Sequence, residues 1–354
     1  MAMPGAIDCD VHPTVPDNKA LLPYLETFWR DSVVERGLTT LESISYPLKS
    51  PLTSRPEWRG PSGVPATDAG ALAAQVFGRW KADTAILNCL YGVQLLFSED
   101  MAAAFCRAVN DWLVKEWLDR DARLRASIVV PMQNTEYAVD EIERCAKDKR
   151  FVQVMVLAMQ EVPLGRRHFW PIYAAAEKHG LPIGIHAGSA YRNPVTSLGW
   201  PTWYIEDYAS QSQGFQSQMA SLICEGVFAK HPGLKVVLIE SGVTWLPGFL
   251  WRFGKFWRGL RTEVPWVDRA PWEIVRDHFR LTIQPFDAPD SAEAVERAIE
   301  HLRSDDILLY ASDYPHWQFD GDAVMPAGIS PTLQRKIAID NPVATYARLK
   351  NGAG

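Results

Sequence analysis

The sequence predicts an α/β fold, a (β/α)8 TIM barrel with insertions over its C-terminal rim. Short apolar runs alternate along the chain with helical patterns, as repeated βα units require. The runs are continuously apolar rather than alternating, which is typical of parallel strands covered on both faces. A doubly wound sheet is the alternative. The predicted strands are Ala6–Val11, Thr84–Leu90, Leu124–Val130, Val152–Leu157, Pro182–His186, Val236–Ile239, Phe279–Ile283 and Ile307–Ala311.

Three of the intervening helices carry clear local signals. The segment Glu99–Asp119 places its large apolar side chains near one stripe, as an amphipathic helix does. Glu136–Lys147 follows Asn134 or Thr135, either of which suits an N-cap. Trp170–Lys178 ends just before a glycine, the residue that favours a helix C-terminus. Helices at these places fill the gaps between predicted strands.

Two segments interrupt the rhythm of the barrel. We predict a single domain, residues 1–354, with a proline-rich insertion at about 13–83 (Pro13–Asp83). So long a segment is not expected to be empty loop, and we interpret it as folded over the barrel mouth. A surface excursion with no role in the active site is the alternative. The second insertion, Gly188–Asp207, starts directly after His186 and is rich in aromatic residues, which suit a planar or apolar substrate or an interface.

Composition excludes several classes of partner. The 354 residues carry a formal net charge of −6, so the chain has no basic surplus to neutralise the phosphates of a nucleic acid. No apolar run approaches the roughly 20 residues of a membrane span. The first acidic residue comes too early for a signal peptide. Five cysteines without C-x-x-C spacing suggest buried reduced thiols, so we predict a cytoplasmic protein.

Metal-type ligands stand at the ends of three predicted strands. Asp10 and His12 close the first, His186 the fifth and Asp313 follows the eighth. Side chains two apart share a face of a strand, so Asp10 and His12 should point the same way, with Asp8 beside them. A barrel brings parallel strand ends to one rim. We therefore predict one divalent metal ion, zinc by default for mixed nitrogen and oxygen ligands, with manganese as the alternative.

Two further rim residues are candidates for catalysis. Glu240 ends the apolar run Val236–Ile239 and should emerge at the rim, where it could be a base or a metal ligand. Its alternative role is to pair with a cation such as Arg252. His316 lies three residues past Asp313 and could supply an imidazole, or could be structural.

Two residues are candidates for binding the substrate. Arg192, in the loop after His186, has the fork geometry that recognises a carboxylate, although a solvated loop arginine is the alternative. Trp317 follows His316 at the rim and offers an aromatic surface. The expected partner is a small molecule.

These motifs resemble the branch of the amidohydrolase superfamily that contains aminocarboxymuconate-semialdehyde decarboxylase and γ-resorcylate decarboxylase. The resemblance runs from IDCDVH to DNPVATYARL, and SDYPHW is its most specific string. It implies that Asp10 and His12 match the strand-one pair of the branch, His186 its strand-five histidine and Asp313 its strand-eight aspartate. The branch usually ends strand six with a histidine that acts on substrate. Here Glu240 holds that place, and it cannot donate as a histidine can.

The sequence leaves the reaction open between schemes that use the same ligands. Hydrolysis of a small, ring-derived or aromatic substrate by metal-activated water is slightly favoured, because carboxylates with one candidate rim histidine suit water activation. Asp313 would then accept a proton and Glu240 would orient or deprotonate the water. The alternative is a non-oxidative decarboxylase or hydratase of an aromatic or unsaturated carboxylic acid, in which Asp313 moves a proton to or from carbon. A metal-free, non-catalytic barrel is a further alternative.

The sequence also predicts a homodimer. The contact should bury part of Pro13–Asp83 or the tryptophan-rich helix around Trp251–Trp257, because exposed apolar patches of that size are rare on monomers.

Overall fold

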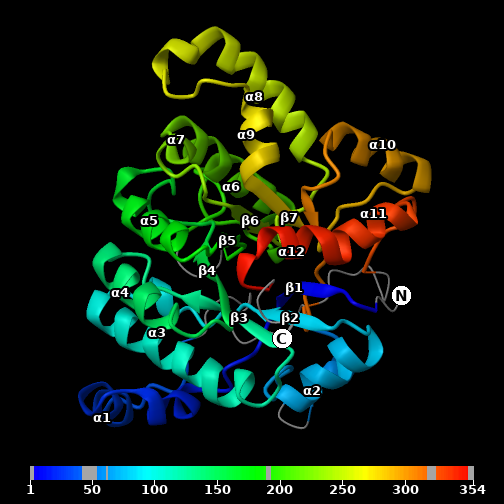
Figure 1. The fold of residues 1–354 in the computed structure, drawn as a ribbon. Helices are drawn as coiled ribbons and strands as arrows, with labels where there is room; N and C mark the ends of the chain where they lie inside the picture. The colour runs from blue at the N-terminus through cyan, green and yellow to red at the C-terminus, as the bar shows by residue number, and fades with distance from the viewer. Residues whose placement is uncertain (1–3, 42–53, 61–62, 189–192, 317–323, 350–354) are drawn as a thin grey trace.

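A computed structural model describes residues 4–41, 54–60, 63–188, 193–316 and 324–349. Eight parallel strands follow one another around a single sheet, and each pairs with the next in the chain (Figure 1). The strands are β1 Ile7–Val11, β2 Thr84–Leu87, β3 Leu124–Val129, β4 Phe151–Leu157, β5 Ile183–His186, β6 Val236–Ile239, β7 Phe279–Thr282 and β8 Leu308–Leu309.

Backbone contacts between the last and first strands bring the sheet round on itself. Val11 and Tyr314 form a parallel bridge, and the Cys9 N–H donates to the Tyr310 carbonyl at 2.9 Å. The Asp313 N–H donates to the Asp10 carbonyl at 3.0 Å. The predicted (β/α)8 barrel is therefore confirmed, and the alternative doubly wound sheet is wrong.

Helices cover the outside of the strands (Figure 1). The α-helices are α1 Thr27–Glu35, α2 Ala69–Ala73, α3 Glu99–Leu113, α4 Thr135–Cys145, α5 Trp170–Lys178, α6 Tyr204–Cys224, α7 Val227–Lys230, α8 Leu246–Leu260, α9 Pro271–His278, α10 Ala292–Leu302, α11 Pro331–Arg335 and α12 Asn341–Thr345. Shorter helical turns are η1 Asn18–Tyr24, η2 Pro56–Trp58, η3 Ala74–Arg79, η4 Val93–Leu95, η5 Val114–Leu118, η6 Arg167–Phe169, η7 Arg261–Glu263, η8 Lys336–Asp340 and η9 Ala347–Leu349.

The three helices predicted from local signals are present. α3 continues into η5, so together they span almost the whole predicted segment, with Phe105 and Trp117 fully buried against the barrel. Asn134 rather than Thr135 caps α4, because its side chain accepts the Tyr137 N–H at 3.0 Å. The bounds of α5 coincide with the predicted segment.

Two apolar layers hold the barrel together. One lies between the strands and the helices, and the other fills the barrel interior. The interior cluster consists of Ile7, Cys9, Ile86, Val152, Val237, Ile239, Leu309 and Tyr346. None of the five cysteines forms a disulfide, and four of them are buried, as expected for reduced thiols. Within the described ranges, no helix has the length and apolar character needed to cross a membrane.

Part of the 13–83 segment reaches the rim of the barrel. Ser54 and His316 form an isolated antiparallel bridge, and the Trp58 ring lies 5.2 Å from the Tyr314 ring. The turn η1 instead packs against α3 on the outside of the barrel. Because residues 42–53 lie outside the described chain, an insertion folded over the mouth stays a prediction.

Candidate metal centre

The end of β1 carries two buried ligand-type side chains that converge on β8. His12 Nε2 lies 3.1 Å from Asp10 Oδ1 and 2.9 Å from Asp313 Oδ1. His12 Nδ1 lies 2.8 Å from the Asn88 carbonyl oxygen, which can only accept, so Nδ1 carries the hydrogen. The lone pair of a neutral His12 is then on Nε2, the atom that faces both carboxylates.

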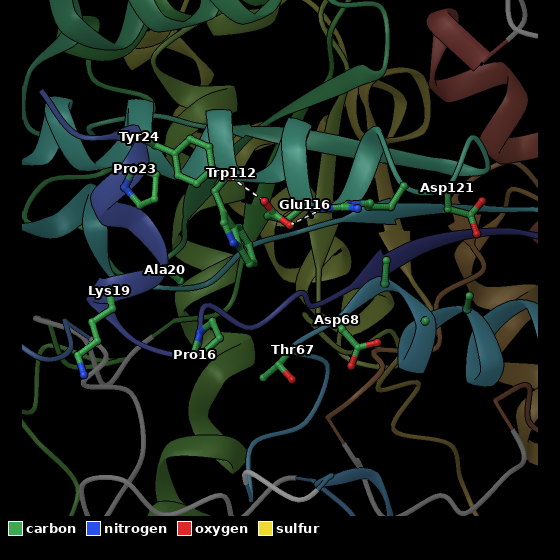
Figure 2. Close-up of a pocket in the computed structure, with 14 residues that line it drawn as sticks. Pro16, Lys19, Ala20, Pro23, Tyr24, Thr67, Asp68, Trp112, Glu116 and Asp121 are labelled. Atoms are coloured by element: carbon green, nitrogen blue, oxygen red, sulfur yellow. Dashed lines mark hydrogen bonds and ion pairs between the residues drawn. The ribbon is translucent and has the colours of Figure 1, made fainter.

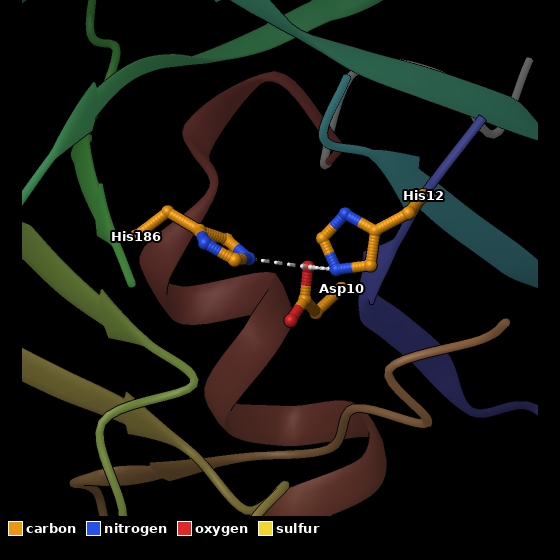
Figure 3. A group of neighbouring side chains, drawn as sticks. All are labelled: Asp10, His12 and His186. Atoms are coloured by element: carbon orange, nitrogen blue, oxygen red, sulfur yellow. Dashed lines mark ion pairs between the residues drawn. The ribbon is translucent and has the colours of Figure 1, made fainter. Parts of the chain in front are cut away.

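β5 brings a second imidazole to the same place. His186 is the last residue of β5, and its Nε2 lies 3.8 Å from Asp10 Oδ1 and 3.6 Å from Glu240 Oε2. Its Nδ1 donates to the Ala187 carbonyl at 2.6 Å, which again leaves Nε2 facing the cluster. The His12 and His186 rings meet edge to face, with centroids 4.9 Å apart. Figure 3 shows both rings directed at the Asp10 carboxylate.

These side chains fit a divalent cation. Asp10, His12 and His186 can offer ligand atoms that lie within 4.8 Å of one another, and so can His12, Asp313 and His316. Asp10 Oδ2 and His186 Nε2 are buried and have no hydrogen-bond partner in the described chain. If His12 is neutral, its Nε2 is a hydrogen-bond acceptor that faces two carboxylate oxygens, which are also acceptors. No hydrogen is then available for a bond between these atoms. A proton or a metal ion must therefore satisfy this contact.

The electrostatics also favour a positive charge at this point. Burial opposes the charged form of His12, but the Asp10 and Asp313 carboxylates outweigh it and raise the pKa of His12 well above its ordinary value. Burial would raise the pKa of Asp313, but the charge of His316 and hydrogen bonds from both imidazoles lower that pKa below its usual range. Burial lowers the pKa of His186 to about 4, so this imidazole is neutral and able to bind a metal at physiological pH.

The two acidic residues at the ends of β6 and β8 share an unusual backbone conformation. Glu240 has φ 60° and Asp313 has φ 58°, the left-handed region that costs non-glycine residues free energy. The Glu240 N–H donates to Thr282 Oγ1 at 3.0 Å, which helps hold this turn. The turn places the Glu240 carboxylate beside His186. Arg252, the cation considered as its partner, is exposed on α8 and lies over the Phe256 ring.

The amidohydrolase family model matches residues 7–348, nearly the whole chain. This chain belongs to the amidohydrolase family. It is therefore an enzyme of the amidohydrolase superfamily, as the sequence motifs indicated.

Curated relatives of this amidohydrolase include decarboxylases. The γ-resorcylate decarboxylase of Polaromonas sp. (strain JS666) is 26% identical over 270 residues, which cover 70% of this chain and 78% of that one. The γ-resorcylate decarboxylase of Rhizobium sp. (strain MTP-10005) is 25% identical over 247 residues, 64% of this chain and 71% of its own.

Solved structures share the fold over almost the full length. The 2,6-dihydroxybenzoate decarboxylase complexed with 2,6-dihydroxybenzoate superposes with a TM-score of 0.69 at 20% identity, covering 98% of this chain and 100% of that one. The 5-carboxyvanillate decarboxylase from Sphingomonas paucimobilis gives a TM-score of 0.68 at 21% identity, with 98% and 99% covered.

The structure brings together most, but not all, of the site residues predicted for this amidohydrolase. Asp10, His12, His186, Glu240 and Asp313 meet at one rim, and His316 joins them through Asp313 at 3.2 Å. Their roles as ligands or catalysts remain proposals. The substrate-binding candidates Arg192 and Trp317 lie outside the described residues.

Asp8 does not join the cluster as the strand alternation suggested. The pairing of β1 with β2 shifts register between Asp8 and Val11. Asp8 Oδ1 accepts the backbone N–H groups of Asp10 at 3.3 Å and Ser312 at 2.9 Å, so its carboxylate braces the backbone that carries the ligands. A register shift between strands interrupts the alternation of side chains between the two faces of a strand. No local sequence pattern predicts such a shift here.

Two tyrosines of α6 lie near the acidic residues and were not identified from the sequence. The Tyr204 and Tyr208 rings meet edge to face, with centroids 4.8 Å apart. Burial raises the pKa of Tyr204 to about 12 and that of Tyr208 well above 10, and the charges of Glu240 and Asp313 add to both shifts. Tyr204 lies near the end of the aromatic second insertion and Tyr208 follows one helical turn later, and this spacing was the available signal.

A groove away from this centre has no comparable chemistry. It encloses about 620 Å³ between η1, the end of α3 and residues 67–73, and none of the candidate ligands lines it (Figure 2). Its Glu116 accepts a hydrogen bond from Tyr24 at 2.9 Å and pairs with Arg120 at 3.3 Å. Because these charges satisfy one another, the groove does not compete with the metal centre as a catalytic site.

Proposed function

We propose that this amidohydrolase is a metal-dependent, non-oxidative decarboxylase of an aromatic or unsaturated carboxylic acid. The observation that carries the proposal is the buried His12 Nε2, which faces Asp10 and Asp313 beside His186 and requires a cation. The decarboxylase relatives, matched over most of their own length, favour this reaction over the hydrolysis that the sequence slightly favoured.

The proposed metal is manganese rather than the zinc expected by default. Two carboxylates in the donor set suit manganese as well as zinc. The related dihydroxybenzoic acid decarboxylase from Polaromonas sp. JS666 has bound manganese, and so does the 5-carboxyvanillate decarboxylase from Novosphingobium aromaticivorans. A divalent ion at this site would supply Lewis-acid stabilisation of negative charge on the oxygens of a substrate. Asp10, His12, His186 and Asp313 would hold it.

Side chains of this protein can then deliver the proton that decarboxylation consumes. The bond between the ring carbon and the carboxylate breaks, its electron pair stays on the ring carbon, and a proton must arrive there as carbon dioxide leaves. Asp313 Oδ1 lies 3.2 Å from His316 Nδ1, so the two side chains can hold and pass one proton. His316 is 20% exposed, which gives the pair a route to solvent protons.

Hydrolysis remains a second candidate because of Glu240. Its carboxylate lies 3.6 Å from His186 Nε2, at the place where the decarboxylase branch usually has a histidine. A carboxylate beside a metal site suits the activation of water as a general base.

The proposed partners are a small-molecule substrate and a second copy of the chain. The cytoplasmic location stays a prediction.

One experiment separates the two reactions. Purified enzyme with manganese is incubated in deuterated water with hydroxybenzoic acids. Separate incubations contain amides or lactones of similar size. Decarboxylation releases carbon dioxide and places one deuterium on the vacated ring carbon. Release of carbon dioxide from no acid, together with cleavage of an amide or lactone, would reject the decarboxylase in favour of hydrolysis.

A further inference from the structure

We propose that Asn88 is a positioning residue of the metal centre, oriented by Ser127 and Gln153 inside the barrel. Asn88 follows β2, lies fully buried, and contacts both of the ligands that β1 supplies. The inference rests on the metal site of the proposed function and assigns to that site a residue that is not itself a ligand.

One residue holds two ligands in place. Asn88 Nδ2 donates to Asp10 Oδ1 at 2.8 Å, and also to the Cys9 carbonyl at 3.3 Å. The backbone carbonyl of Asn88, which the substitution Asn88→Ala leaves in place, accepts from His12 Nδ1 at 2.8 Å and selects the tautomer with its lone pair on Nε2. Groups that hold metal ligands in this way set their orientation and basicity, and their loss commonly weakens metal binding.

The neighbours of Asn88 determine which way its amide points. Ser127 Oγ donates to Asn88 Oδ1 at 2.6 Å, and Gln153 Nε2 lies 3.4 Å from the same oxygen. Because that oxygen receives donors from β3 and β4, the amide nitrogen must face Asp10.

Behind Asn88, hydrogen bonds continue in one direction across the barrel. Tyr346, just after α12, donates to Gln153 Oε1 at 3.1 Å, and Gln153 Nε2 donates to Ser127 Oγ at 2.9 Å. Ser127 then donates to Asn88, and Asn88 to Asp10. All five residues have zero exposed surface, so water cannot substitute for any lost bond at low cost.

The absence of a side chain at Gly184 leaves room for the Gln153 amide in this chain of hydrogen bonds. It lies on β5 two residues before His186, and a Cβ there would come within 2.5 Å of both Cδ and Nε2 of Gln153. Because the three atoms nearest to that Cβ all belong to the Gln153 side chain, Gly184→Ala should displace the Gln153 amide. This variant gives a second way to disturb the same series of hydrogen bonds.

The test is the affinity of metal-free protein for manganese, measured by calorimetry or by the electron paramagnetic resonance of free Mn²⁺. We expect Asn88→Ala to weaken manganese binding by about 10- to 100-fold. Gln153→Leu and Gly184→Ala should weaken it in the same direction but less, because each leaves the bond between Asn88 and Asp10 possible.

Asn110→Ala is the matched control. Asn110 is also a buried asparagine, and its Nδ2 donates to the Val129 carbonyl at 2.9 Å and to Glu141 Oε1 at 2.7 Å, outside the centre. This variant should lose thermal stability yet keep the wild-type dissociation constant for manganese. A merely structural role for Asn88 would give the same result in Asn88→Ala.

The outcomes separate this inference from the proposed function. If the wild type binds manganese and Asn88→Ala binds it within about twofold as tightly, the positioning role is overturned and the metal site stands. If the wild type binds no stoichiometric metal, the metal site and the inference both fail. Should Asn88→Ala not fold, Gln153→Leu decides: unchanged manganese affinity in that variant overturns the proposed chain of bonds.

Discussion

His316 stacks on His12 above the Asp313 carboxylate, with ring centroids 4.4 Å apart and planes 20° from parallel. Both rings contact the same Asp313 oxygen, His12 at 2.9 Å and His316 at 3.2 Å. His12 is buried and directed into the centre, whereas His316 is partly exposed at the rim. Asp313 therefore links the proposed metal to an imidazole that can exchange protons with solvent.

We predict that His316→Gln keeps the metal and loses turnover. The substitution removes a titratable group, and general acid–base catalysis typically contributes about 10²- to 10⁴-fold. Metal content is measured by mass spectrometry and kcat by carbon dioxide release. Wild-type kcat in the loaded variant would leave His316 a purely structural residue of the rim.

Removing both imidazole ligands should remove the metal. We predict that the double variant His12→Ala/His186→Ala contains no stoichiometric manganese or zinc, because the centre would lose both of its buried imidazoles and keep only carboxylates and the partly exposed His316. The double variant His231→Ala/His278→Ala is the control, since both of these histidines are buried outside the centre, against Glu177 and the Leu234 carbonyl. Full metal content in the first variant would disprove the site.

Metal binding should release close to one proton at pH 7. The raised pKa of His12 means that this imidazole is protonated in the metal-free protein, and the ion must displace that proton. His186, with its pKa lowered to about 4, is already neutral and releases none. Below the His12 pKa, manganese affinity should therefore rise about tenfold per pH unit.

Calorimetry in buffers of different ionisation enthalpy measures that proton. Asp313 gives no comparable release, because its lowered pKa means that it is already ionised at pH 7. Affinity that does not change between pH 6 and pH 7 would contradict a protonated His12.

Glu240→Gln distinguishes a ligand, a base and a bystander. The change keeps the shape of the side chain and removes its charge 3.6 Å from His186 Nε2. We predict retained metal with a loss of turnover, because the carboxylate emerges from a constrained turn beside the centre. Loss of metal would make Glu240 a ligand instead. Wild-type metal and kcat together would remove it from the catalytic machinery.

We predict a homodimer contact that includes the second half of α8. α8 and the segment after it project beyond the rest of the barrel in Figure 1, and Trp251, Phe256 and Leu260 are 57%, 45% and 52% exposed. Exposed apolar side chains of this size favour burial against a second copy. Light scattering should show a dimer, and Phe256→Asp/Leu260→Asp should shift it to monomer, while Val162→Asp, at another exposed apolar site, should not. A wild-type monomer at micromolar concentration would refute the contact.

Much of the fold follows from local sequence patterns. Apolar runs predicted all eight strands, because strands covered on both faces are mostly apolar. Asn134 and the stripe from Glu99 onwards predicted α4 and α3, because capping and helical periodicity act within a few residues. The convergence of Asp10, His186 and Asp313 was also predictable, since parallel strands of a barrel end at one rim.

The sequence by itself thus determined the barrel, the ligand-type residues at its rim and, through its motifs, the family. Only the tertiary structure decided how those residues are held. The register shift after Asp8, the hydrogen bonds that orient Asn88 and the stacking of His316 on His12 each depend on strands far apart in the chain. No local preference encodes such contacts, because their free energy exists only once the strands have been placed side by side.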